Sequence, residues 1–347
     1  MRAEAPDPTG SAVLGNRLIV EASGNVRLML GKVELGQGIG TALAQFAAEE
    51  LDVSFERLQL VTVDTDISPD ESYTFSSISV QQAGPPTRRA AAAARAHLMQ
   101  QAADDLGVDA NTLRVTDGEI LAGDEPTGMT YWSLIGDSDV QLDFADDQVL
   151  KPVADHSIVG ESYERIDIPA KVFGGEAYLQ DLRLPDMVHA RVVRPPAERA
   201  ELKAIDTTAA EAAPGVLKVV HDGNFIAVIA EREQQARDAA KILHEAAGWR
   251  FVTDMPDEDR IFDWLQNAPL QTEPVASTQA DIDAETTTVS AVYQRAYQAH
   301  ASISPSAAIA QFDGENLTVW SHAQGMYPLR GGLSYVLGLD LDKIRCI

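Results

Sequence analysis

The sequence contains a single cysteine, Cys346, among its 347 residues. One thiol excludes an internal disulfide, a zinc site built from cysteines and a four-cysteine iron–sulfur cluster held by this chain alone. Positive charge is scarce as well, because 27 lysines and arginines stand against 53 aspartates and glutamates, giving a formal net charge of −26. A chain this acidic is not expected to bind nucleic acid.

Long apolar runs are also missing, since no stretch reaches the ~18 uninterrupted apolar residues of a membrane-spanning helix. The first ten residues, MRAEAPDPTG, show no basic stretch followed by an apolar one. We therefore expect no membrane span and no signal peptide. The expected location is the cytoplasm, with the periplasm as the alternative if a partner carries the export signal.

Apolar residues are plentiful, at 45% of the chain against 23% charged residues. This is the composition of a soluble globular protein, and the length gives room for two or three domains of about 150 residues. The hydrophobic pattern predicts three blocks, at 12–150, 166–250 and 287–347. The acidic segments 120–165, which begins inside the first block, and 251–286 show little periodicity and are interpreted as loops and connectors.

The first block alternates between strand and helix patterns. Every second residue is apolar over 16–30, around a Ser-Gly-Asn turn, which predicts a hairpin. Helical spacing follows over 40–51 and strand alternation over 58–63. An alanine-rich helix is predicted over 87–106, where a Pro-Pro pair precedes it. The mixture predicts an α+β fold, with α/β segments in this block.

The second and third blocks combine short alternating runs with helical spacing. They predict strands over 188–193, 216–220, 225–230, 287–296 and 316–321, and helices over 231–247 and 328–337.

Three loops carry candidate chemistry. The first is Gly36-Gln37-Gly38, between a strand and a helix. Glycines let the backbone turn sharply and approach a ligand, and the helix that follows offers unpaired N–H groups to an anion. A plain tight turn is the commoner meaning of such a pattern, so both interpretations stay open.

The second loop is the polar segment 74–82 at a helix entry, which includes Ser76, Ser77, Ile78 and Ser79. Hydroxyls at this position either cap the helix or bind a polar ligand. The third loop follows a strand and carries Gln324, which either binds a ligand or satisfies loop backbone. For the nearby His322, and for His300, a structural role is favoured over catalysis.

Taken together, these segments resemble one family. The motifs that carry the resemblance are Gly31-Lys32-Val33-Glu34-Leu35-Gly36-Gln37-Gly38, Ala48-Glu49-Glu50-Leu51, 76–82, 169–196, 300–306 and 320–330. In this order they resemble the N-terminal half of the molybdenum-binding subunit of the xanthine dehydrogenase/aldehyde oxidase family. The nicotinate dehydrogenase and isoquinoline oxidoreductase branch is the most similar one.

The resemblance implies molybdopterin-binding α/β segments, 12–150 and the incomplete 287–347, on either side of an a/b-hammerhead domain at 166–250. It implies a molybdopterin cofactor, expected in the cytosine dinucleotide form, which holds molybdenum through its own dithiolene. Gly36, Gln37 and Gly38 would contact the pterin and its phosphates. Ser76, Ser77, Ile78 and Ser79 would line the cofactor, and Gln324 would hydrogen-bond an oxygen on the metal.

The resemblance also implies partners: the remaining half of the large subunit, an iron–sulfur subunit and a flavin or cytochrome electron acceptor. The expected reaction is hydroxylation of an aldehyde or an aromatic N-heterocycle with water as oxygen source. The family's general-base glutamate has no counterpart here, and neither Glu34 nor Glu50 matches it. No catalytic residue is therefore assigned to this chain, and activity is not expected from it alone. A non-catalytic structural subunit that binds no cofactor is the alternative.

Overall fold

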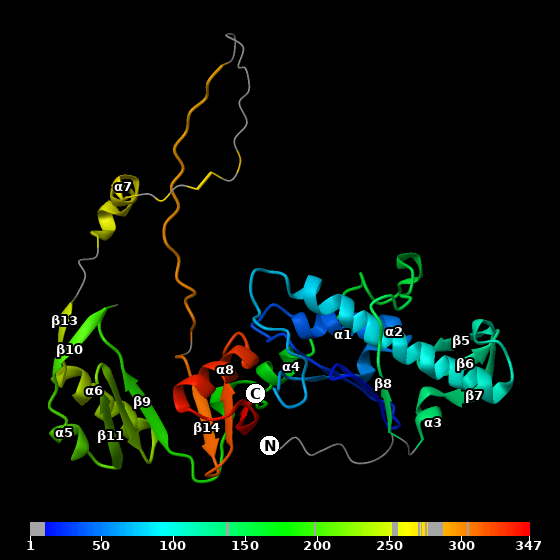
Figure 1. The fold of residues 1–347 in the computed structure, drawn as a ribbon, viewed down its shortest axis with the longest axis horizontal. Helices are drawn as coiled ribbons and strands as arrows, with labels where there is room; N and C mark the ends of the chain where they lie inside the picture. Colours follow the sequence, from blue (N-terminus) through cyan, green and yellow to red (C-terminus); the bar gives the residue numbers. More distant parts are fainter. Residues whose placement is uncertain are drawn as a thin grey trace. The chain divides into compact units, whose positions relative to one another are not determined.

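The computed structural model describes residues 11–136, 139–197, 199–251, 256–269, 271, 273, 274, 276, 287–303 and 305–347. The first ten residues, on which the expectation of no signal peptide rests, lie outside this set. The chain divides into two compact units (Figure 1). Unit 1 comprises Met1–Leu182 and Ser304–Ile347, and unit 2 comprises Arg183–Ile303. Within the described residues, no helix combines the length and the apolar character needed to cross a membrane.

Unit 1 is built on a mixed five-stranded sheet. The predicted hairpin is confirmed as two antiparallel strands, and the chain then crosses over through a helix to a parallel strand. In order across the sheet, the strands are β4 (Leu58–Val61), β3 (Val26–Met29), β2 (Leu18–Glu21), β1 (Ser11–Leu14) and β8 (Val140–Leu142).

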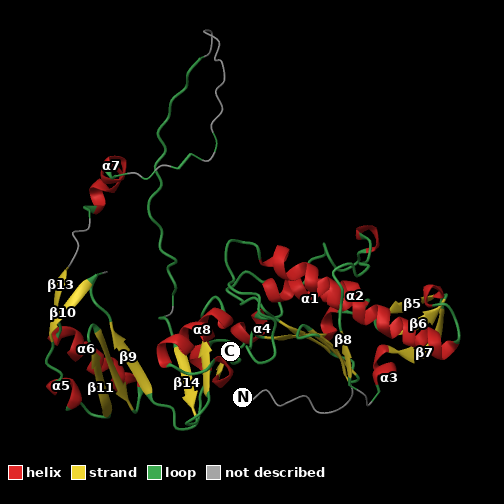
Figure 2. Cartoon of the chain, viewed as in Figure 1, coloured by secondary structure: helices red, strands yellow, loops and turns green. Residues whose placement is uncertain are grey.

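Helices α1 (Ile39–Leu51) and α2 (Ser79–Leu106) lie along one face of this sheet (Figure 2). The predicted helix over 40–51 is confirmed. Both helices are rich in buried alanine, and their small side chains allow a close approach. A Cβ added at Gly84 of α2 would lie only 3.0 Å from the ring of Phe46 on α1.

The start of α2 differs from the prediction. The Pro-Pro pair was expected to open the helix, but Pro85 and Pro86 lie inside it, and the helix begins at Ser79. Because proline has no N–H, the carbonyls four residues before each proline lose a helical partner. The turn that precedes the pair keeps one helical hydrogen bond, from the Gln82 N–H to the Ile78 carbonyl at 3.0 Å, and is held further by contacts outside the helix. One such contact is the Gln82 side chain, which accepts a hydrogen bond from Lys32.

Residues 120–165 are not the unstructured connector that their polarity suggested. They contain strands β6 (Glu119–Ala122) and β7 (Glu125–Thr130) and helix α3 (Tyr131–Ile135). Strand β6 pairs with β5 (Leu113–Thr116) on one side and with β7 on the other. The prediction was wrong because this small sheet is half-exposed. Polar and apolar side chains are mixed along its strands, and few of them, such as Ile120, are buried.

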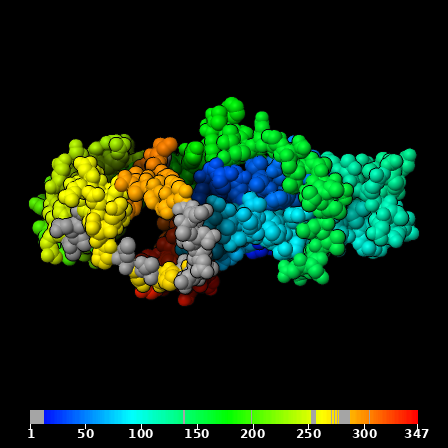
Figure 3. All heavy atoms as spheres, turned by 90° about the horizontal axis from the view of Figure 1, so that it is seen from above, coloured from blue at the N-terminus to red at the C-terminus, as the bar shows by residue number. Residues whose placement is uncertain are grey.

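Residues 151–167, which overlap the end of that segment, lie alongside helix α1, and we call them the strap. Its first half is held by Glu49, whose carboxylate accepts three backbone N–H groups, those of residues 157–159, at 2.7 to 3.0 Å. Further along, Gln45 donates to the Glu161 carbonyl at 3.0 Å, and the Ile166 N–H donates to Thr41 at 3.1 Å. The strap therefore runs antiparallel to α1, beside it (Figure 3).

The C-terminal part of unit 1 is a second small sheet. Strands β14 (Ala308–Phe312), β15 (Leu317–Ser321) and β16 (Ile344–Cys346) pair in that order, next to helix α8 (Met326–Leu337). The predicted strand over 316–321 and the predicted helix over 328–337 are confirmed. The predicted strand over 287–296 is wrong: these residues form no strand, and Tyr293 is 92% exposed, because no neighbouring strand pairs with them.

The described part of unit 2 contains two small sheets and three helices. The predicted helix over 231–247 is confirmed as α6, and the three predicted strands are confirmed as β9, β11 and β12. The described elements are β9 (His189–Val193), β10 (Ala200–Ala204), α5 (Thr208–Glu211), β11 (Val216–Asp222), β12 (Phe225–Ala230), α6 (Glu233–Ala246), β13 (Gly248–Phe251) and α7 (Ile261–Asn267). The expected boundaries of the a/b-hammerhead domain stay predictions.

Candidate functional site

Three segments that the sequence singles out meet at Thr74. Its hydroxyl oxygen accepts a hydrogen bond from the Val33 backbone N–H at 2.8 Å. Its backbone N–H donates to the Gln324 carbonyl at 2.8 Å, and its own carbonyl accepts from the Gln324 side-chain amide at 3.2 Å. Thr74 is only 4% exposed. One buried threonine thus joins the loops that carry Gly36, Ser76 and Gln324, although Thr74 and Gln324 are 250 residues apart in sequence.

The turn Gly36-Gln37-Gly38 leads into α1 with positive φ angles of 100° at Gly36 and 81° at Gly38, which favour glycine. The Gln37 side chain folds back on the turn. Its oxygen accepts from the Leu35 N–H at 2.6 Å, and its nitrogen donates to the Val33 carbonyl at 3.0 Å. The residue is exposed. One amide N–H and one oxygen lone pair of Gln37 remain available to a ligand.

The backbone N–H groups of the same turn are occupied by Glu34. One carboxylate oxygen accepts from Gly36 and Gly38, both at 2.9 Å, and the other accepts from Gly40 at 3.4 Å. Arg165 of the strap donates to the Gly36 carbonyl at 2.6 Å and lies 3.4 Å from Glu34. The helix N-terminus that the sequence offers to an anion therefore already holds a carboxylate of its own chain.

The serine loop, Ser76–Ser79, has an unusual backbone. Ser76 and Ser77 have φ angles of 54° and 57°, a left-handed conformation that costs residues other than glycine about 1 kcal/mol or more each. Both are exposed. Ile78 is the N-cap of α2, and this end of the helix has no side-chain cap hydrogen bond. The cap that the sequence offered as the structural alternative for these hydroxyls is therefore not formed.

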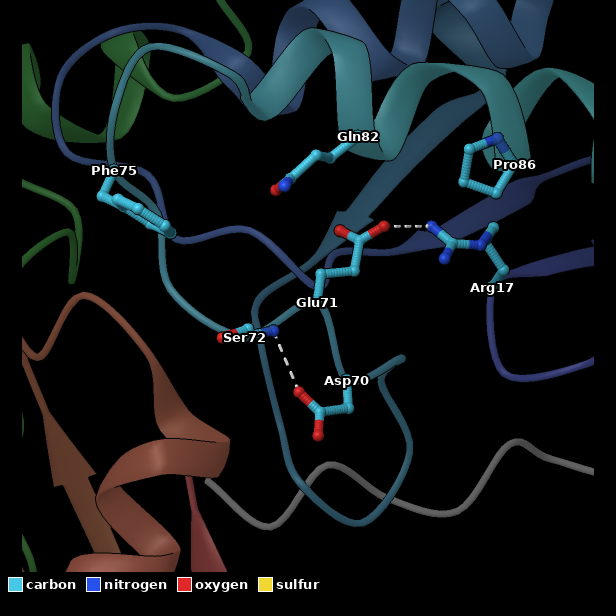
Figure 4. Close-up of a pocket in the computed structure, with 7 residues that line it drawn as sticks. All are labelled: Arg17, Asp70, Glu71, Ser72, Phe75, Gln82 and Pro86. Carbon is cyan, nitrogen blue, oxygen red and sulfur yellow. Dashed lines mark hydrogen bonds and ion pairs between the residues drawn. The ribbon is translucent and has the colours of Figure 1, made fainter. Parts of the chain in front are cut away.

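A pocket of about 410 Å³ adjoins this loop (Figure 4). The side chains of Glu71, Phe75 and Gln82 point toward a common space, and the Arg17 guanidinium pairs with Glu71 at 2.7 Å. The pocket thus combines polar groups with an exposed aromatic ring. It is lined by Arg17, Asp70, Glu71, Ser72, Phe75, Gln82 and Pro86.

The remaining candidate residues lie outside the Thr74 contacts. His322 is exposed at the end of β15, and His300 is exposed in unit 2. Glu50 is buried and accepts from the Arg88 guanidinium at 2.8 Å and from the Lys151 N–H at 2.9 Å. Glu50 is therefore a structural carboxylate.

Three residues that organise the site, Lys32, Glu34 and Thr74, were not assigned a role from the sequence. Lys32 and Glu34 stand in the motif that carries the family resemblance, and Thr74 is the first residue of the polar segment 74–82. Their positions gave a signal, but their roles did not follow from it, because each one bonds to backbone groups whose places depend on the fold.

The exposed polar groups of the glycine turn and the serine loop suit a pterin. Among the residues that the structure describes, no group of three His, Cys, Asp or Glu side chains is arranged to hold a metal ion. Exposed serine hydroxyls and a half-used glutamine amide fit the polar edge of a pterin. Because Glu34 occupies the N–H groups of the glycine turn, those groups do not fit a phosphate in this conformation.

Comparisons with known proteins point to the same cofactor. Residues 6–151 and 270–347 each match a molybdopterin cofactor-binding domain model. A nicotinate dehydrogenase subunit from Pseudomonas putida is 37% identical over 95% of this chain and 29% of its own length. The beta subunit of isoquinoline 1-oxidoreductase from Brevundimonas diminuta is 26% identical over 97% of this chain and 50% of its own.

Among solved structures, quinoline 2-oxidoreductase from Pseudomonas putida 86 matches 53% of this chain and 29% of that chain, with 18% identity and a TM-score of 0.38. The chain thus spans between about a third and a half of the length of these two sequence relatives. Two cofactor-binding domains flank residues 152–269, in an α+β fold. On these matches, the chain belongs to the molybdopterin-binding subunits of the xanthine dehydrogenase family of molybdenum oxidoreductases.

Proposed function

We propose that this chain supplies molybdopterin contacts to a molybdenum hydroxylase that oxidises an aldehyde or an aromatic N-heterocycle with water as oxygen source. The observation that carries the proposal is the junction at Thr74, which joins the glycine turn, the serine loop and the Gln324 loop in one unit. Relatives named for nicotinate, isoquinoline and aldehyde oxidation support the substrate class.

Each loop has a distinct role in this proposal. Gly36, Gln37 and Gly38 face the pterin, and Gln37 offers it the unused half of its amide. Ser76–Ser79 line the cofactor with hydroxyls that are not used to cap α2. Gln324 donates from its side-chain amide toward an oxygen near the metal. When bound, the cofactor supplies two-electron oxidation chemistry, and the protein positions it.

The cofactor form and the partners extend the proposal. We propose the cytosine dinucleotide form, iron–sulfur clusters in a partner subunit and a flavin or cytochrome as electron acceptor. The general base is supplied by the remaining part of the large subunit, because the nearby acids are engaged: Glu34 by backbone N–H groups and Glu71 by Arg17. Exposed apolar side chains on α8, including Tyr335 at 90% exposure, suit contact with that part.

The test is to produce the full chain in cells that make the cofactor and to measure pterin and molybdenum per chain. Turnover is then measured in the complex with its partner subunits. Gln324→Ala is expected to retain pterin but to lose turnover per molybdenum by roughly 100-fold, as for the loss of one oxyanion donor. His322→Ala, an exposed neighbour, is the matched control and should leave turnover unchanged.

Two results would count against the proposal. If Gln324 only supports loop backbone, Gln324→Ala lowers stability by about 1–3 kcal/mol while turnover per molybdenum is preserved. A wild-type chain that carries no pterin even in the assembled complex would favour the non-catalytic alternative.

A further inference from the structure

Lys32 is a buried cation with a full set of hydrogen bonds. It is 1% exposed and lies four residues before Gly36, in the segment that leads to the glycine turn. Its ammonium donates to the Glu71 carbonyl at 2.6 Å, to the Tyr73 carbonyl at 2.9 Å and to the Gln82 side-chain oxygen at 2.7 Å. All three donors of the ammonium are therefore used.

The choice of acceptors is unusual for a buried charge. Burial lowers the pKa of Lys32, and the nearby carboxylates of Glu71 and Asp70 oppose that shift. None of the three direct partners is a carboxylate oxygen. Lys151 of unit 1, whose side chain is 9% exposed, instead bonds directly to the carboxylates of Glu49 and Asp52. Because its partners are two backbone carbonyls and a side-chain amide, the ammonium holds these segments in position and does not form a direct ion pair with a carboxylate.

The acceptors lie on both sides of the serine loop in the sequence. Glu71 and Tyr73 precede the loop, and Gln82 follows it. Lys32 thus bridges the two ends of the segment that contains Ser76–Ser79. It also holds the part of α2 that lies before Pro85, where the prolines remove helical hydrogen bonds.

We propose that Lys32 is a positioning residue that holds the serine loop in its left-handed conformation, ready for the cofactor. The inference rests on the proposed function only in naming the cofactor as the ligand of the loop. The hydrogen bonds that Lys32 makes to both ends of the loop are present in the chain without cofactor. Lys32 touches no cofactor in this proposal, and it acts through the loop that it closes.

The experiment compares Lys32→Met with Lys151→Met in the full chain. Methionine keeps an unbranched stem and removes the ammonium in both variants. Hydrogen exchange, followed by mass spectrometry on cofactor-free protein, is read at the backbone amides of residues 74–80. Lys32→Met should accelerate exchange there by roughly 10- to 100-fold, the range expected when hydrogen bonds to a charged group are lost. Lys151→Met should leave it at the wild-type rate, although both variants lose global stability.

A second variant keeps the test informative if Lys32→Met does not fold. Gln82→Leu removes one of the three acceptors and should accelerate exchange at 74–80 by roughly tenfold. Unchanged exchange in the folded Lys32→Met chain, or in Gln82→Leu when Lys32→Met does not fold, would overturn the inference. An equal acceleration in Lys151→Met would do the same, because it would reflect a general loss of stability.

Bound pterin, measured on chains produced with the cofactor, separates this inference from the proposed function. Lys32→Met should lose pterin, whereas Lys151→Met should retain it. Retention of pterin by Lys32→Met at the wild-type level would overturn the inference. A wild-type chain without pterin would instead reject the proposed function, and the exchange result would still decide the role of Lys32.

Discussion

At the scale of single residues, three charged side chains inside unit 1 bond to the backbone of irregular segments. Glu34 accepts N–H groups of the glycine turn, Glu49 accepts three from the strap, and Lys32 donates to two carbonyls. Irregular segments have backbone groups that no helix or sheet satisfies, and burying such groups unpaired is costly. Part of the acidic excess of the chain therefore serves to order loops.

Glu49 gives a pH prediction. It is 1% exposed, and hydrogen bonds from the strap together with Lys151 lower its pKa from 4.5 to about 2, against the opposing effect of burial. Because the pKa is lower in the folded state, the stabilisation is complete above about pH 5 and is lost as the pH falls toward 2. Glu49→Gln should lower the free energy of unfolding by about 3 kcal/mol at pH 7 and flatten its decline between pH 5 and 2.

Denaturant unfolding of both proteins across this pH range measures the effect. Glu56→Gln, at an exposed glutamate just after α1, serves as the control and should follow the wild-type curve. A Glu49→Gln curve parallel to that of the wild type would show that Glu49 does not contribute to the acid sensitivity.

The sequence predicted the candidate loops better than the bonds within them. The three loops were named from glycines, hydroxyls and a strand end, and the structure brings all three to Thr74. The partners of Gln37 and Glu34 could not be predicted, because a carboxylate beside a glycine turn serves an external anion or the turn itself depending on one side-chain rotation.

At the scale of elements, the strap gives α1 a second layer of contacts along its length. Its hydrogen bonds recur at Glu49, Gln45 and Thr41, which are four residues apart on one face of the helix. The last contact is Arg165 on the glycine turn. The N-terminal turn of α1 is therefore ordered from a segment more than a hundred residues later in the sequence.

Arg165→Ala tests whether that last contact matters. Since the Arg165 side chain is 31% exposed and its ion pairs are screened by solvent, its loss should change global stability little. Exchange at the amides of residues 36–40 should still rise by roughly tenfold, because the Gly36 carbonyl and Glu34 both lose a partner. Arg114→Ala, which removes an exposed ion pair with Asp124, is the matched control, and equal exchange in the two variants would exclude a role of Arg165 in the turn.

Elements with strong periodicity were predicted well, and those shaped by their neighbours were not. The helix at α1 and the hairpin at β2 and β3 follow from spacing alone. The first turns of α2 were missed because the Pro-Pro pair is typical of a helix start. The turn before the pair keeps a helical hydrogen bond, from the Gln82 N–H to the Ile78 carbonyl at 3.0 Å, and Lys32 supports it further. The predicted strand over 287–296 is wrong because alternating apolar and polar residues form a stable strand only where a neighbouring strand pairs with them.

At the scale of the whole molecule, the two units have separate cores. Leu43 belongs to the core of unit 1, and Leu243 belongs to a smaller core in unit 2. Each is essentially inaccessible to solvent. The two units should therefore respond independently to damage in their cores.

Leu43→Ala and Leu243→Ala form a matched pair for this prediction. Each should lower the stability of its own unit by about 2–5 kcal/mol through a cavity. Amide exchange in the core strands of the other unit should remain at the wild-type rate, as native-state hydrogen exchange can show. Faster exchange in both units from either substitution would mean that the chain unfolds as one cooperative body.

The carboxylate of Glu34 has a consequence for ligand competition. It is tethered beside the N–H groups of Gly36 and Gly38, so its effective concentration there far exceeds that of inorganic phosphate or sulfate in solution. Small anions must therefore compete with the Glu34 carboxylate for these N–H groups. A molecule that binds here must either make enough contacts elsewhere to displace Glu34 or use Gln37 and leave Glu34 in place. In both cases the turn discriminates in favour of large, multiply anchored ligands.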